Sequence, residues 1–121
     1  MKLESKISIF NNASDYLSYP AGSIIFSAGD PGDVMYIVKT GEVEIKVGER
    51  VIETHDQGNL IGEMSIIDQS PRSATAVAKT DCQLVAVDEK RFLFLVQQTP
   101  FFALQVMHIM AERLRKVMGK G

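Results

Sequence analysis

The sequence predicts a mainly β domain that is followed by C-terminal helices. Three observations lead to this prediction. Between about residues 19 and 88, short apolar runs rich in β-branched and aromatic side chains alternate with glycine-containing turns. After Asp88 the apolar residues recur at helical spacing. The length of 121 residues, with 45% apolar and 23% charged side chains, suits one compact globular domain over residues 1–121.

Six segments of the first part have the pattern expected of strands. Residues 43–47, for example, alternate in polarity, which is typical of a strand with one buried face. The breaks between the segments hold Gly, Pro, Asp and Asn, the residues that turns require. The predicted strands are Ser23–Phe26, Val34–Lys39, Glu42–Val47, Arg50–Thr54, Ala74–Ala78 and Gln83–Val87. Many short strands with regularly spaced turns favour a sandwich or barrel-like architecture.

The residues after Asp88 predict two helices. Asp88 is suited to cap a short helix that ends at Gln98, and Pro100 to open a second helix from Phe101 to about Met118. One stripe of the second helix is apolar and comprises Leu104, Met107, Ala111, Leu114 and Met118. Two alternatives stay open for this stripe: packing on the β core, or a dimer seam, because its spacing is close to a heptad. A solvated helix end is predicted for the basic residues Arg113, Arg115, Lys116 and Lys120.

The composition argues against several classes of protein. A net charge of −2 offers no polycationic surface to nucleic acid or to an anionic membrane. The single cysteine, Cys82, is predicted to be a packing residue, and with no signal-peptide pattern the sequence indicates a cytoplasmic protein. His55 and His108 lack partners at metal-ligand spacing, and no nucleophile–base arrangement occurs. The sequence therefore predicts neither a metal site nor an enzyme.

One segment between the predicted strands has the chemistry of a sugar-phosphate site. Gly62 lets the backbone approach a ligand closely, and the Glu63 carboxylate can accept hydrogen bonds from sugar hydroxyls. The residues after Glu63 suit one helical turn, whose N–H groups favour an anion. Arg72 offers a planar charged fork to a phosphate, and Ser73 and Ala74 leave backbone N–H groups accessible. From the residues alone, a structural ion pair between Glu63 and Arg72 is an equal alternative.

Several ordered groups of residues resemble the cyclic nucleotide-binding domain family, which includes bacterial catabolite activators, protein-kinase regulatory subunits and gated ion channels. Two of them resemble the family's phosphate-binding cassette: Ile61-Gly62-Glu63-Met64-Ser65-Ile66 and Pro71-Arg72-Ser73-Ala74-Thr75. The upstream signature is similar over residues 25–38 and in Gly41-Glu42-Val43, and the downstream region over residues 78–84. The resemblance spans roughly residues 17–118.

The resemblance implies an eight-stranded, jelly-roll-like β-roll over about residues 19–88, followed by helices over about residues 89–118. It implies a regulatory domain that binds a cyclic nucleotide, without a cofactor. Ser73 stands where many cAMP binders carry Ala or Ser, so cAMP is expected rather than cGMP. Glu63 would receive the ribose 2′-hydroxyl and Arg72 the cyclic phosphate. The implied site comprises Gly62, Glu63, Met64, Ser65, Arg72, Ser73 and Ala74.

The resemblance defines the base and the partner less closely. Val117 and Met118 stand where catabolite activators carry the Thr and Ser that contact the base, so an apolar lid over the purine is expected. The expected output is movement of the C-terminal helix, transmitted through a homodimer contact on that helix or to an effector protein. The alternative function is a β-roll protein-interaction domain that has lost nucleotide binding.

Overall fold

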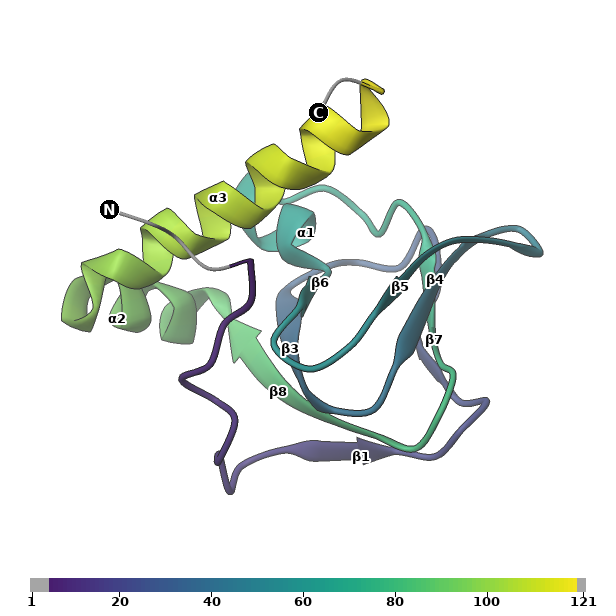
Figure 1. The fold of residues 1–121 in the computed structure, drawn as a ribbon, viewed down its shortest axis with the longest axis horizontal. Helices are drawn as coiled ribbons and strands as arrows, with labels where there is room; N and C mark the ends of the chain where they lie inside the picture. Colours follow the sequence, from purple (N-terminus) through teal and green to yellow (C-terminus); the bar gives the residue numbers. More distant parts are fainter. Residues whose placement is uncertain (1–4, 120–121) are drawn as a thin grey trace.

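A computed structural model of the chain describes residues 5–119 and contains two four-stranded antiparallel sheets with helices gathered at one side (Figure 1). The helix α3 runs along this side, with α1 beneath it and α2 folded back beside its N-terminal half (Figure 1). The strands are β1 (Leu17–Tyr19), β2 (Ile24–Phe26), β3 (Val34–Thr40), β4 (Val43–Val47), β5 (Arg50–His55), β6 (Leu60–Ile61), β7 (Thr75–Ala78) and β8 (Cys82–Asp88). The helices are α1 (Glu63–Asp68), α2 (Glu89–Gln98) and α3 (Pro100–Val117).

The strand order is β1-β8-β3-β6 in one sheet and β2-β7-β4-β5 in the other. Consecutive strands such as β1 and β2, or β3 and β4, belong to different sheets, so the chain winds back and forth between them. This arrangement confirms the predicted eight-stranded β-roll. All six strands predicted from the pattern are present, and no bound differs by more than one residue. The strands β1 and β6 have three and two residues and were too short to show a pattern of their own.

The core consists of two clusters on either side of the β1-β8-β3-β6 sheet. Alternate residues of β3 point to opposite faces, so Met35 and Ile37 enter one cluster while Tyr36 and Val38 enter the other. The first cluster lies between this sheet and the helices and includes Ile7, Phe10, Leu60, Ile66, Val85, Val87, Phe102, Val106 and Ile109. The second cluster lies between the two sheets and includes Cys82, which confirms the predicted packing role of this residue.

Local sequence signals account for the start of each C-terminal helix. The Asp88 side chain accepts a hydrogen bond from the Arg91 N–H at 2.8 Å and so caps α2, as predicted. Pro100 occupies the first position of α3, where its missing N–H costs no intrahelical bond. Within residues 5–119 no single helix is long and apolar enough to cross a membrane; α2 and α3 pass that criterion only as a pair, which is bent by 116°.

The apolar stripe predicted on α3 does not pack on the core. Its members Leu104, Met107, Leu114 and Met118 are all exposed, Leu114 to 61%. The buried side of α3 is instead formed by Phe102, Gln105, Val106 and Ile109. The core-packing alternative for the stripe is therefore wrong. Because α3 has apolar residues on two sides, the sequence alone permits either side to face the sheet. In the structure the side that carries Phe102 packs into the core.

Candidate functional site

The turn that precedes α1 brings the backbone of Gly62 against the Arg72 side chain. Gly62 is the N-cap of α1 and has a φ of +75°, a conformation that glycine adopts without strain. A Cβ at this position would overlap Arg72 Nη1 and would lie 3.4 Å from the Phe26 ring. The close approach that glycine was predicted to allow is thus made, in this structure, by the Arg72 guanidinium.

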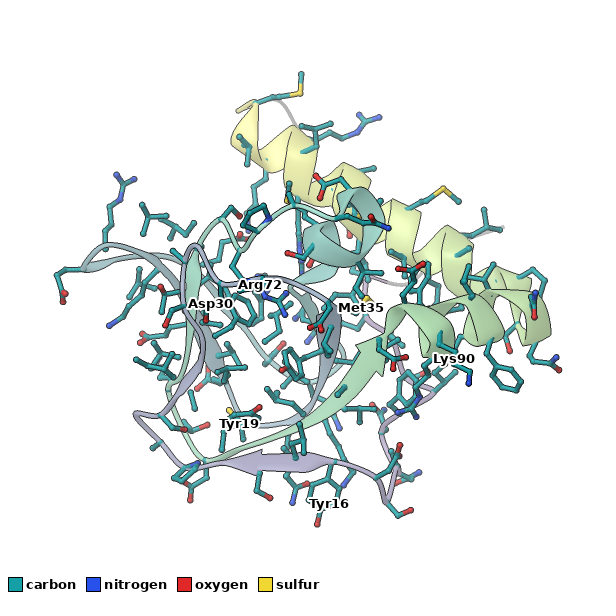
Figure 2. All side chains as sticks on the ribbon, turned by 180° about the vertical axis from the view of Figure 1, so that it is seen from behind. Tyr16, Tyr19, Asp30, Met35, Arg72 and Lys90 are labelled. Atoms are coloured by element: carbon teal, nitrogen blue, oxygen red, sulfur yellow. The ribbon has the colours of Figure 1, made fainter. Side chains whose placement is uncertain are left out.

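Arg72 lies inside the roll, among the strands, rather than on its rim (Figure 2), and the residue is only 6% exposed. Its Nη1 donates a hydrogen bond to the Gly62 carbonyl at 3.2 Å, and Nη2 donates to the Val34 carbonyl. The guanidinium stacks over the Phe26 ring, with Cζ 4.2 Å from the ring centroid. The Arg72 backbone is also fixed, because its N–H donates to the Asp30 carbonyl at 2.9 Å.

The Arg72 charge has no anionic partner within residues 5–119. No carboxylate of these residues lies within 4.0 Å of the guanidinium, and the buried Nε has no hydrogen-bond partner there. The predicted alternative of a structural ion pair between Glu63 and Arg72 is therefore wrong. A permanently charged group is costly to bury alone, and a donor left unpaired adds to that cost. Among these residues, the Arg72 guanidinium therefore keeps an uncompensated charge and a free donor at the pocket wall.

The Glu63 carboxylate is bound by an arginine of the C-terminal helix. Arg113 Nη1 donates to Glu63 Oε1 at 2.8 Å, and Arg113 Nη2 donates to the Leu60 carbonyl at 2.6 Å. The two side chains are 19% and 9% exposed. The prediction that Arg113 belongs to a solvated basic helix end is wrong, whereas Arg115 and Lys116 are exposed. Lys120 lies outside the described residues.

Arg113 is a pocket residue that the sequence reasoning missed. One signal could have indicated it. Arg113 follows Ile109 by four residues, and residues four apart share one face of a helix. Because Ile109 belongs to the buried side of α3, Arg113 continues that side to the point where it meets the cassette.

The segment predicted to form the site lines a pocket of about 140 Å³. All seven predicted residues take part: Gly62, Glu63, Met64, Ser65, Arg72, Ser73 and Ala74. Of these, Met64 is 51% exposed, whereas Ser65 is buried against the loop before β3, where a Cβ on Gly32 would overlap its hydroxyl. The remaining wall comes from Phe26, Ile45, Ile52, Glu53, His55, Leu60, Ile61, Pro71 and Arg113.

The pocket adjoins a larger cleft of about 1260 Å³ between β5 and α3. Ile52, Glu53, His55 and Arg113 line both spaces. Of the two residues predicted to cover the base, Val117 lines the cleft but not the pocket, and Met118 lines neither. Both are exposed, Val117 to 85%. The apolar lid over the purine thus stays a prediction.

The model of a protein family, "Cyclic nucleotide-binding domain", matches residues 16–99. The chain belongs to the cyclic nucleotide-binding domain family. The matched region contains all eight strands and α1, and with them the whole segment from Gly62 to Ala74.

Relatives of two kinds share this domain. The cyclic AMP receptor protein of Thermus thermophilus is 38% identical over 103 residues, which cover 81% of this chain and 48% of that protein. The cAMP-dependent protein kinase regulatory subunit of Aspergillus niger is 39% identical over 83 residues, which cover 67% of this chain and 20% of that protein. The chain thus spans about half the length of the first relative and a fifth of the second.

A solved structure supports the same assignment. The crystal structure of the Thermus thermophilus catabolite activator protein superposes on this domain with a TM-score of 0.78 at 36% identity, covering 85% of this chain and 51% of that one. The predicted β-roll with C-terminal helices is thus the architecture of the family.

Proposed function

We propose that this domain is a regulatory sensor that binds cAMP in the pocket beside α1. The observation that supports it best is Arg72, a guanidinium that is 94% buried and meets no anion within residues 5–119. A cyclic phosphate supplies one negative charge and oxygens that accept from Nε and Nη1. The aromatic ring of Phe26 and the backbone of Asp30 hold the guanidinium in place before the ligand arrives.

The other pocket residues complete the proposed site. The Glu63 carboxylate accepts a hydrogen bond from the ribose 2′-hydroxyl, and Ser73 and Ala74 offer backbone N–H groups to the phosphate. Gly62 and Ser65 shape the wall near α1, and Met64 contributes at the pocket edge. Because Arg113 already occupies Oε1 of Glu63, nucleotide binding and the position of α3 depend on one carboxylate. Movement of α3 is the proposed output.

The names of the relatives favour cAMP over cGMP, since both contain cyclic AMP or cAMP. They are a receptor and a regulatory subunit, which supports a regulatory and not a catalytic role. Residues 1–121 form one proposed binding domain, with the cytoplasm as its proposed location. It needs no cofactor.

Calorimetric titration with cAMP and cGMP tests the proposed function, on the wild-type protein and on Arg72→Ala. The variant is expected to bind cAMP about 10- to 150-fold more weakly, because it loses charge-assisted hydrogen bonds to the phosphate. Arg72→Lys serves as a second variant, since it keeps the charge but loses the planar fork. Its affinity is expected to fall as well.

Arg91→Ala is the matched control. Like Arg72, Arg91 donates to a backbone carbonyl, that of Ala86, and lies over an aromatic ring, that of Phe10. Unlike Arg72, it is paired with a carboxylate, that of Asp15, and it does not line the pocket. The control is expected to bind cAMP as the wild type does. Absence of binding of either nucleotide at millimolar concentration would contradict the proposal and favour a protein-interaction domain that has lost its ligand.

The exposed stripe of α3 is the proposed surface for a second copy of the chain. Leu104, Met107, Leu114 and Met118 repeat at near-heptad spacing and face away from the core, as the seam of a helix pair requires. Sedimentation equilibrium is expected to detect a dimer whose dissociation constant rises at least about tenfold in Leu114→Glu. Leu93→Glu, on an exposed position of α2, is the control. A wild-type monomer would instead favour an effector protein as the partner.

A further inference from the structure

Two polar residues of β5, Glu53 and His55, line the pocket without a role in the proposed phosphate and ribose contacts. Thr54 between them is exposed, whereas His55 is buried and Glu53 is half-buried. Ile52 lines the same pocket as Glu53, because the register of β4 and β5 shifts beside it and interrupts the alternation of faces. The sequence pattern of β5 indicates no site, because only the fold brings this strand opposite the cassette.

The Glu53 side chain is an ionised hydrogen-bond acceptor. The His55 side chain, with Nε2 at 3.4 Å from Glu53 Oε2, is the main cause that lowers the pKa of Glu53, and the charges of Arg113 and Lys116 add to it. Oε2 thus faces His55, while the contact of Glu53 with His55 leaves Oε1 to a ligand.

The surroundings of Glu53 suit the edge of a purine. Arg72 and Glu63 take the phosphate and the ribose in the proposed function, so the base must contact the rest of the wall. There Ile45 and Ile52 offer apolar surface to the faces of a flat ring. Glu53 lies directly opposite Ile45 on the neighbouring strand, where a carboxylate meets the polar edge of that ring.

We propose that the Glu53 carboxylate accepts a hydrogen bond from the exocyclic amino group of adenine and so determines the preference for cAMP. This inference rests on the proposed function. Adenine carries an amino donor at position 6, where guanine carries a carbonyl oxygen. An ionised carboxylate accepts from the first and repels the second. A site that binds through such a contact discriminates strongly against a ligand that lacks the partner group.

The test compares cAMP with purine riboside 3′,5′-cyclic monophosphate, which lacks only the amino group, and with cGMP. The wild-type protein is expected to bind cAMP about 10- to 150-fold more tightly than the amino-free analogue. In Glu53→Ala this ratio is expected to fall close to one. In Glu53→Gln the discrimination against cGMP is expected to weaken, because the amide can donate to the guanine oxygen. The ratio of two affinities in one variant does not depend on how much of that variant is folded.

Glu44→Gln is the matched control, since Glu44 lies on the adjacent strand β4, outside the pocket. It removes the same charge and is expected to leave all ratios unchanged. Equal binding of cAMP and the amino-free analogue by the wild type would overturn this inference alone, as would an unchanged ratio in Glu53→Ala. A wild type that binds none of the three ligands would overturn the proposed function, and this inference with it.

Discussion

Replacing Phe102 by alanine is expected to lower the free energy of unfolding by about 3–5 kcal/mol. Phe102 has no exposed surface and lies in the core cluster between α3 and the β1-β8-β3-β6 sheet. Its ring also meets Phe92 of α2 edge to face, with 5.7 Å between the ring centroids. The substitution leaves a cavity where both C-terminal helices join the roll. Urea denaturation measures the loss as a lower midpoint with an unchanged slope.

Phe94→Ala provides the control for this prediction, because Phe94 is 58% exposed on α2. The same deletion of a phenyl ring is there expected to change the free energy of unfolding by no more than about 0.5 kcal/mol. Similar losses in both variants would contradict the view that burial of the Phe102 ring in the core, rather than the presence of an aromatic ring on these helices, accounts for the loss.

The parts of the fold that local chemistry determines were predicted well. Alternation in β4 and the turn residues around it depend only on neighbours in sequence, and so does the Asp88 cap of α2. The strands β1 and β6 are defined by their pairing with β8 and β3, which lie far away in the sequence. The orientation of α3 could not be predicted for a similar reason. Both of its sides carry apolar residues, and only the packing against the sheet distinguishes the buried one.

In the site, too, the features that depend on neighbours in sequence were predicted, and those that depend on distant contacts were not. Glu63 and Arg72 are nine residues apart and belong to one recognisable cassette, so their place in one pocket was predicted. The residues alone left open an ion pair between them, whereas in the structure Glu63 binds Arg113 and Arg72 binds two carbonyls. Arg113 lies 50 residues beyond Glu63, and Glu53 belongs to a different sheet from the strand that precedes α1. Tertiary structure alone brings these groups together.

Arg113→Ala is expected to lower the free energy of unfolding of the nucleotide-free protein by about 3 kcal/mol. Removing one partner of a buried ion pair leaves the other charge without compensation, here the Glu63 carboxylate. Urea denaturation measures this loss of stability as well. Arg115→Ala, on an exposed position of the same helix, is the control and is expected to change stability by at most about 0.5 kcal/mol.

The double variant Glu63→Gln with Arg113→Met separates the ion pair from the rest of α3. It removes both charges at once, so it is expected to be more stable than Arg113→Ala alone. Loss of the pair also has a consequence for signalling, because Glu63 is the one pocket residue that α3 binds through an ion pair within residues 5–119. Amide hydrogen exchange of α3 is therefore expected to respond to cAMP in the wild type and much less in Arg113→Ala. An equal response in both would show that the helix senses the nucleotide through other contacts.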